Sequence, residues 1–96
     1  MSSKYAFTKG LKELRFLFCH TSEQSAATRS FLQRAYPTMK KHNPHTPIMM
    51  REAVGTIPRV YARYGLGKEK QELLNGLSDQ QVEQSVTRLV KEAEAQ

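Results

Sequence analysis

Hydrophobic positions recur along the chain with two different periods, and their order predicts an alternation of strands and helices. Residues 11–19 become continuously apolar toward their end, which is typical of a strand covered on both faces. Residues 59–64 alternate between polar and apolar, which predicts a half-exposed strand. Short runs at 48–52 and 68–74 predict two further strands, the first parallel to the opening strand and the second forming a hairpin around Gly65-Leu66-Gly67.

A helical period of apolar residues follows the first predicted strand. This helix is expected to open at Thr21 or Ser22, whose hydroxyls would cap it, and to reach about Lys41. Its apolar stripe consists of Ala27, Phe31, Leu32, Ala35 and Met39. Pro37 lies inside this pattern, so we expect it either to kink the helix or to end it near residues 35–36.

A second helix completes the predicted architecture. Ser78-Asp79-Gln80-Gln81 has the pattern of a capping box, and the helix after it places one apolar face on Val82, Val86, Leu89, Val90 and Ala93. The order βαβ followed by ββα predicts an α/β, thioredoxin-like fold with a four-stranded mixed sheet and flanking helices. We expect one such domain over residues 11–96, after an N-terminal extension over residues 1–10. In this layout a proline begins the third strand, so the bond between Ile57 and Pro58 is expected to be cis.

Two serines occupy the place where a thioredoxin-type fold would carry its redox cysteines. Ser22 and Ser25 stand, with two residues between them, just ahead of the first predicted helix. Disulfide exchange requires a thiolate, which a hydroxyl cannot supply near neutral pH. The single cysteine, Cys19, ends the preceding strand, so we expect a buried small hydrophobic residue there rather than a monothiol nucleophile.

Other candidate chemistry is equally sparse. His42 and His45 lie on either side of a proline-containing loop and, even with Cys19 and His20, lack the paired spacing of zinc sites. One cysteine cannot hold an iron–sulfur cluster that needs four ligands, and no glycine-rich dinucleotide turn follows the first strand. The sequence therefore predicts no catalytic residues, no metal and no cofactor.

Positive charge is concentrated in the first part of the chain. The formal net charge is +6, and residues 1–70 carry thirteen lysines and arginines against four glutamates, whereas residues 71–96 are net acidic. Cations and aromatic rings are interleaved around the edge of the second and third strands, which makes a candidate partner interface of Arg51, Arg59, Tyr61, Arg63 and Tyr64. This composition suits protein contacts, and it also suits RNA or a basic edge that discourages aggregation.

The chain offers no sequence feature of a membrane-spanning protein. Its longest apolar stretch, residues 16–19, is far below the roughly 20 residues that cross a bilayer. The N-terminal ten residues lack an apolar core and a small-residue cleavage site, so we expect no secretion signal.

Several short motifs resemble one known family. They cover about residues 11–92 and comprise Leu14-Arg15-Phe16 leading to Cys19, Arg29 to Phe31, Asn43-Pro44 with Pro47-Ile48, Arg51-Glu52, Pro58, Ala62-Arg63-Tyr64-Gly65, Gly67-Lys68-Glu69 and Leu77-Ser78. The chain thereby resembles the thioredoxin-like domain shared by certain mitochondrial ribosomal proteins and a small accessory subunit of respiratory complex I. Some relatives carry a second cysteine directly after the Arg-Glu pair, where this chain has Ala53.

This resemblance implies a function in protein assembly. The expected role is a non-catalytic accessory subunit, peripheral to the mitochondrial inner membrane on its matrix side, which supports assembly and stability of the matrix arm of complex I. Its expected partners are other subunits of complex I, with no cofactor and no nucleic acid. The alternative is a mitochondrial ribosomal protein that contacts rRNA. The acidic end of the chain, Glu92 to Gln96, argues against this alternative.

Overall fold

The computed structural model of this chain describes residue 7 and residues 10–93. The secondary-structure elements are β1 (Leu11–Phe18), α1 (Ala26–His42), β2 (Ile48–Glu52), β3 (Arg59–Tyr64), β4 (Glu69–Leu73) and α2 (Asp79–Glu92). Short 3-10 turns at Glu23–Ser25 and Gly65–Gly67 lead into α1 and β4 respectively. The strands and helices thus occur in the predicted order, within a few residues of the predicted bounds.

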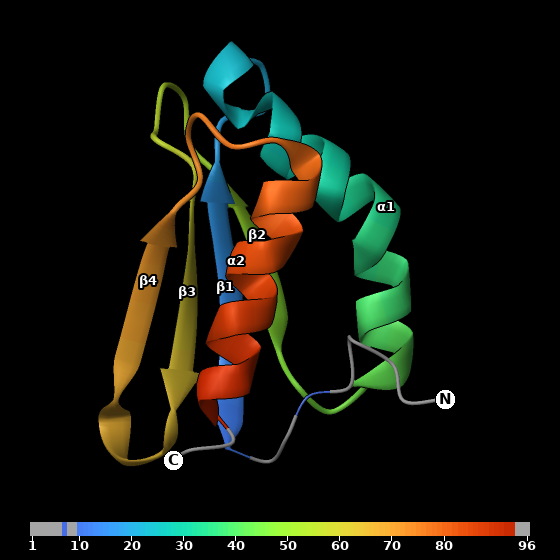
Figure 1. Ribbon diagram of the computed structural model, residues 1–96, viewed down its shortest axis with the longest axis vertical. Coiled ribbons are helices and arrows are strands. Elements are labelled where there is room, and N and C mark those ends of the chain that lie inside the picture. The colour runs from blue at the N-terminus through green and yellow to red at the C-terminus, as the bar shows by residue number, and fades with distance from the viewer. Residues whose placement is uncertain (1–6, 8–9, 94–96) are drawn as a thin grey trace.

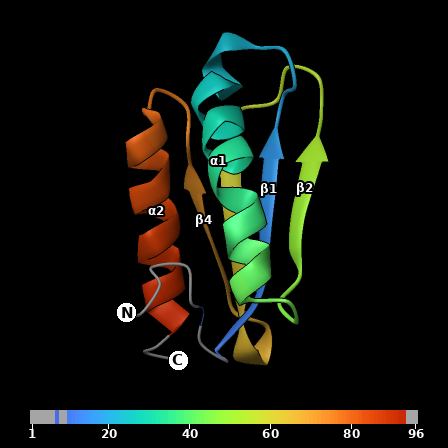
Figure 2. The ribbon, with the colours of Figure 1, turned by 90° about the vertical axis from the view of Figure 1, so that its right-hand side faces the viewer.

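The four strands form one mixed sheet in the order β2-β1-β3-β4. Strand β1 pairs in parallel with β2 and antiparallel with β3, and β3 and β4 form an antiparallel hairpin. Both helices cover the same face of this sheet, as Figures 1 and 2 show from two sides. The predicted α/β class with a four-stranded mixed sheet is confirmed, and the arrangement is compatible with a thioredoxin-like fold.

The hydrophobic core fills the space between the sheet and its two helices. Phe16 of β1 and Phe31 of α1 are both fully buried, with their ring centroids 6.2 Å apart. The expectation that β1 is covered on both faces is wrong, because no helix of the described residues lies against the other face and Leu17 remains partly exposed there. The sheet therefore has one packed face and one open face.

Helix α1 differs from its prediction at its N-terminal cap and at Pro37. The hydroxyl cap predicted from Thr21 or Ser22 is wrong: the N-cap residue is Ser22 in the 3-10 turn and Ser25 in α1, and neither side chain makes a capping hydrogen bond. The helix also continues through Pro37 to His42, so the alternative in which the proline ends it is wrong. Asn43 follows the last turn, and its Nδ2 donates to the carbonyl of Met39 at 2.9 Å.

Helix α2 begins with the predicted capping box. The Oγ atom of Ser78 accepts from the N–H of Gln81 at 3.2 Å, and the Ser78 N–H donates to Oε1 of Gln81 at 2.9 Å. The predicted apolar face of α2 is buried in full. At the far end of the helix, a Cβ added to Gly10 would lie 2.3 Å from the carbonyl oxygen of Ala93, so the backbone before β1 packs directly on the end of α2.

The predicted cis bond before Pro58 is wrong, since the described residues contain no cis peptide bond. The chain changes direction earlier, in a turn where the N–H of Thr56 donates to the carbonyl of Ala53 at 3.2 Å and Gly55 has a φ of +73°. The carbonyl of Pro58 then accepts from Leu74 at 2.8 Å. A trans peptide therefore suffices for entry into β3.

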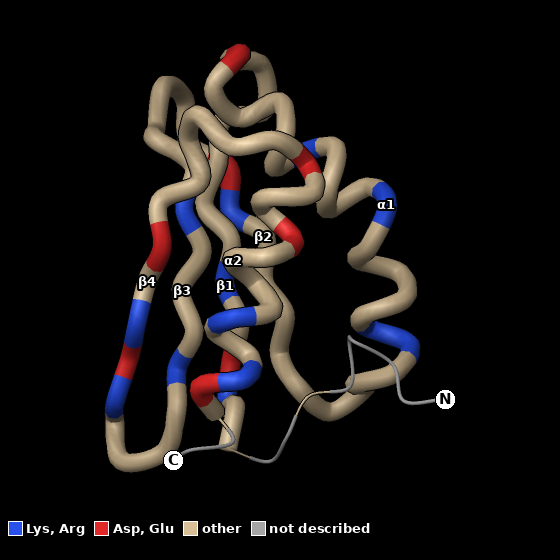
Figure 3. The backbone as a smooth tube through the Cα atoms, viewed as in Figure 1, with Lys and Arg blue, Asp and Glu red and all other residues tan. Residues whose placement is uncertain are grey.

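The two edges of the sheet differ in chemistry. Strand β4 carries acidic and basic side chains along its length, which Figure 3 shows as alternating colours. Strand β2 has the sequence Ile-Met-Met-Arg-Glu, in which the first three residues are apolar. Charge protects the β4 edge against pairing with other strands, whereas β2 has less of this protection.

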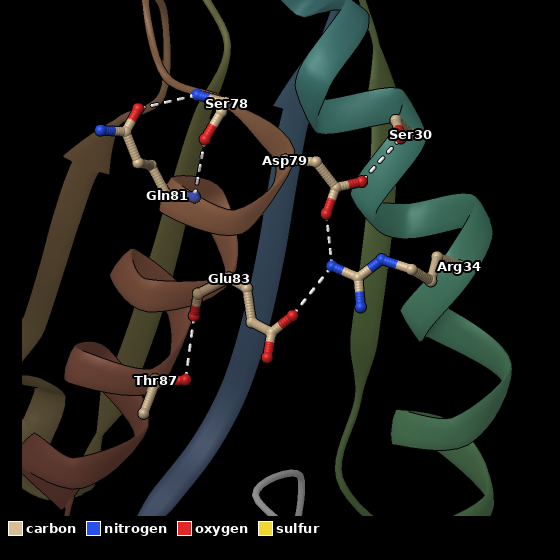
Figure 4. A network of polar contacts seen from close by, with 7 residues as sticks. All are labelled: Ser30, Arg34, Ser78, Asp79, Gln81, Glu83 and Thr87. Atoms are coloured by element: carbon tan, nitrogen blue, oxygen red, sulfur yellow. Dashed lines mark hydrogen bonds and ion pairs between the residues drawn. The ribbon is translucent and has the colours of Figure 1, made fainter.

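A polar network joins the two helices (Figure 4). The Arg34 guanidinium on α1 bonds to Asp79 and, at 2.8 Å, to Glu83, both on α2. The hydroxyl of Ser30 donates to the Asp79 carboxylate at 2.6 Å. The hydrogen bond from Arg34 lowers the pKa of Asp79 below its usual value.

This network predicts a pH dependence of stability. Because the pKa of Asp79 is lower in the folded chain than in the unfolded chain, its contribution is complete above the unfolded pKa of about 3.9, declines below it and is lost as the pH falls through the lower, folded pKa. Asp79→Asn should lower the free energy of unfolding by about 1 kcal/mol at pH 7 and by less at pH 3, as measured by urea unfolding. The exposed Glu23→Gln serves as a control with less than about 0.5 kcal/mol of change. A difference that persisted undiminished at pH 3 would contradict the assignment.

Candidate protein interface

The open face of the sheet gathers four of the five residues predicted for an interface. In the strand register, Leu17 of β1 lies between Arg51 of β2 and Arg59 of β3, while Arg15 lies between Met49 and Tyr61. The face consists of Glu13, Arg15, Leu17, Met49, Arg51, Arg59, Tyr61, Arg63, Glu69, Gln71 and Leu73. The prediction placed these cations around a sheet edge, but β3 is an inner strand, so they lie on a face instead.

Tyr64, the fifth predicted residue, lies on the other side of the sheet. Its ring is 1% exposed, and its hydroxyl donates to the carbonyl of Leu89 on α2 at 2.7 Å. Burial raises the pKa of Tyr64 to about 12. Its inclusion in an exposed interface is therefore wrong, and the period of two could have shown this, because Tyr64 shares its face with the buried Val60 and Ala62.

Part of the positive charge on the open face is neutralised by residues that sequence reasoning missed. Glu13 accepts from Arg63 at 2.8 Å and lies 3.8 Å from Arg15. Arg15 also pairs with Glu69 at 3.1 Å, and its guanidinium carbon stands 4.8 Å from the centroid of the Tyr61 ring. Arg15 and Arg63 therefore already have carboxylate partners within the chain.

Arg51 and Arg59 differ from these arginines. Among the described residues neither has a carboxylate partner; Arg51 is exposed, and Arg59 is half-buried and makes only a 3.4 Å bond to the carbonyl of Ile57. Leu17 lies between them, and Leu73, which is paired with Arg59 in the register, is 55% exposed. A shallow depression of about 300 Å³ lies against Leu17 and Arg51 and extends to Tyr61. We name Leu17, Arg51, Arg59, Tyr61 and Leu73 the arginine face.

The arginine face has the composition of a protein contact site. Arginine and tyrosine are enriched among residues that dominate binding energy, and an apolar centre between them supplies area that can be removed from water. Two unpaired guanidinium groups would be satisfied by carboxylates of a partner. The geometry therefore fits an acidic protein surface, and its role as an interface remains a prediction.

The two serines of the lost redox motif lie beside Cys19, where Ser25 is buried and Ser22 is partly buried. Cys19 is 2% exposed, and its Sγ accepts from the N–H of Gly55 at 3.4 Å and lies 3.6 Å from Oγ1 of Thr21. Hydrogen bonds from the backbone of Thr21 and then of Gly55 lower the pKa of the Cys19 thiol to about 6. Ser25 is fully buried and accepts from the N–H of Cys19 at 3.0 Å. Ser25 therefore acts as a structural acceptor for the end of β1, and the pair Ser22 and Ser25 offers no dithiol.

The histidine positions considered for zinc do not assemble. Within residue 7 and residues 10–93, no three His, Cys, Asp or Glu side chains are grouped so that they could hold a metal ion. None of the helices in that part of the chain is both long and apolar enough to span a bilayer.

Comparison of the sequence with those of known proteins identifies a matching domain family and several relatives. Residues 28–79 match the model of the mitochondrial ribosomal protein L51 / S25 / CI-B8 domain. The chain is 66% identical to the NADH-ubiquinone oxidoreductase 10.5 kDa subunit of Neurospora crassa over 91 residues, which is 95% of this chain and 97% of that protein. It is 40% identical, over 95% of its own length and 94% of the relative, to NADH dehydrogenase [ubiquinone] 1 alpha subcomplex subunit 2 of Arabidopsis thaliana. The Mus musculus protein of the same name is 40% identical over 76% of this chain and 74% of that protein.

Proposed function

Because the chain belongs to the mitochondrial ribosomal protein L51 / S25 / CI-B8 domain family, we propose that it is a non-catalytic accessory subunit of mitochondrial NADH dehydrogenase, respiratory complex I. The observation that carries this proposal is the 66% identity, over nearly both full lengths, to a relative named as a subunit of that enzyme. The relatives from Arabidopsis thaliana and Mus musculus bear names of the same kind. The chain would sit peripherally on the matrix side of the inner membrane and support assembly and stability of the matrix arm.

The arginine face supplies the proposed means of attachment. Arg51 and Arg59 flank the apolar Leu17 and have no carboxylate partner among the described residues, which favours an acidic surface on a neighbouring subunit. A contact of about 800 Å² on this side would be of standard size, with a few arginine and tyrosine anchors carrying most of the energy. The chain would thus contribute contact energy and no chemistry of its own.

Charge reversal on the arginine face tests this function. In cells that lack their own copy, the tagged chain should co-purify with NADH dehydrogenase, whereas Arg51→Glu/Arg59→Glu should lower the recovered enzyme by roughly tenfold or more, because a lost charge pair at an interface costs several kcal/mol. Lys68→Glu/Lys91→Glu changes the net charge equally on exposed residues outside the face and should assemble normally. Circular dichroism checks that both variants fold.

Two outcomes of this experiment would contradict separate parts of the proposal. A wild-type chain that never comigrates with NADH dehydrogenase would overturn the assignment to that enzyme. Comigration with mitochondrial ribosomes instead would favour the ribosomal members of the family, and direct RNA binding would then show a steep loss of affinity with salt. A folded arginine variant that assembles normally would leave the assignment intact and exclude the arginine face as the interface.

A further inference from the structure

The outer edge of β2 presents backbone groups without a strand beside them. The carbonyl of Pro47 and the N–H of Ala53 both bond to β1, at 3.0 Å each. In a parallel ladder alternate residues direct their N–H and C=O to opposite sides, so the odd-numbered residues of β2 face β1. The N–H and C=O groups of Ile48, Met50 and Glu52 therefore point away from the sheet, and β2 ends the strand order of the described chain.

An apolar groove runs beside this edge on the helix side. It has a volume of about 430 Å³ and lies between β2 and α1, with a lining that includes Phe18, Leu32, Tyr36, Pro37 and Met50. Met50 is 45% exposed although the strand register places it on the same side as the buried Phe16. The groove thus continues the packed layer outward, past the last strand.

The opposite side of the same edge is basic, whereas the groove side is apolar. Arg51 projects onto the open face, is exposed and has no carboxylate partner among the described residues. A strand added beside β2 would alternate its side chains between these two sides. We propose that the β2 edge receives an extended segment of a partner protein, with apolar side chains entering the groove and an acidic side chain pairing with Arg51.

This inference rests on the proposed function, because the partner is taken to be another subunit of the assembled enzyme. The contact would be the addition of a partner strand to the β2 edge. Main-chain hydrogen bonds to Ile48, Met50 and Glu52 would give affinity, while the groove and Arg51 would select the sequence. The arginine face would then be continuous with the added strand through Arg51.

A second copy of this chain satisfies the same edge less well. Antiparallel pairing of two β2 strands about Met50 would place Arg51 opposite Met49 and Glu52 opposite Ile48, so Arg51 would gain no carboxylate. Parallel pairing in register is excluded, because both copies present their even-numbered residues at this edge, whereas a parallel ladder pairs a residue that faces the partner strand with one that faces away. The edge therefore favours a partner with a different sequence.

Hydrogen exchange on the full chain, free and within purified NADH dehydrogenase, tests the proposal. The outward backbone amides of residues 48, 50 and 52 should exchange roughly tenfold or more slowly in the enzyme, because new main-chain hydrogen bonds must open before exchange. Residues 69–73, on the charged β4 edge of the same sheet, are the internal control and should change by less than about twofold. Unchanged exchange at residues 48–52, or equal slowing at both edges, would overturn the proposal.

A pair of variants separates edge pairing from general contact. Met50→Asp places a carboxylate at the apolar groove and should lower assembly by roughly tenfold, whereas Val54→Asp makes a similar change at an 88% exposed loop position and should not. Normal assembly of a folded Met50→Asp chain would overturn the proposal, as would concentration-dependent dimerisation that protects residues 48–52 in the isolated chain. A chain present in the enzyme with an unprotected β2 edge would refute this inference alone, while a chain that never enters the enzyme would refute the proposed function as well.

Discussion

Tyr64→Ala should lower the free energy of unfolding by about 3 to 5 kcal/mol, the usual cost of removing a buried aromatic ring. The ring is 1% exposed, and its hydroxyl bonds to the carbonyl of Leu89, so the substitution creates a cavity between β3 and α2 and leaves that carbonyl without its donor. A domain of this size has a total stability of only about 5 to 15 kcal/mol. Urea unfolding followed by circular dichroism should therefore show a large fall in the midpoint.

Two neighbouring substitutions make this prediction specific. Tyr64→Phe keeps the ring and removes only the hydroxyl, so it should cost about 1 to 2 kcal/mol. Tyr61→Ala, three residues earlier on the open face, should cost less than about 1 kcal/mol, because it loses chiefly the contact with Arg15. Equal losses for Tyr61→Ala and Tyr64→Ala would contradict the assignment of the two rings to opposite faces of β3.

Pro37→Ala should raise the free energy of unfolding by about 2 kcal/mol. Proline within a helix costs about 3 kcal/mol relative to alanine, since it cannot donate to the carbonyl four residues earlier and crowds that turn. The gain is reduced by about 0.4 to 1 kcal/mol because alanine makes the unfolded chain more flexible. Pro37 is exposed near the middle of α1, so little packing is lost with the ring.

The measurement is again the midpoint of urea unfolding, with Pro44→Ala as the matched control. Pro44 lies in the exposed turn after α1, where no helical hydrogen bond is restored, so its replacement should leave stability unchanged or slightly lower. A fall in stability for Pro37→Ala would mean that the proline contributes to the groove beside β2 more than it costs the helix.

The elements that the sequence predicted well are those determined by local patterns. The alternation over β3 and the capping box of α2 depend on residues a few positions apart, and both occur as expected. The open face of β1 was missed because it depends on which side of the sheet the two helices choose, a property of the whole topology. The hydroxyl cap predicted from Thr21 or Ser22 does not form, and the Oγ atom of Ser25 accepts from the N–H of Cys19 instead, a contact that the local sequence pattern does not indicate.

The candidate interface was predicted in its residue types and not in its arrangement. The spacing of Arg51, Arg59, Tyr61 and Arg63 was visible, but their union on one face required the register between β1 and both of its neighbours. Glu13 lies 50 residues before the arginine that it binds, and no local pattern connects them. The distinction between engaged and unpaired arginines therefore emerges only from the folded chain.

The packing of Gly10 on the carbonyl of Ala93 has a practical consequence for labelling. It brings the start of β1 and the end of α2 to the same end of the molecule (Figure 1). A fluorescent reporter attached at either position would therefore lie at that end. Leu17, between Arg51 and Arg59, lies at the other end of β1, about 20 Å away at the usual rise of a strand. Reporters attached there would leave the arginine face uncovered and could register a bound partner by energy transfer.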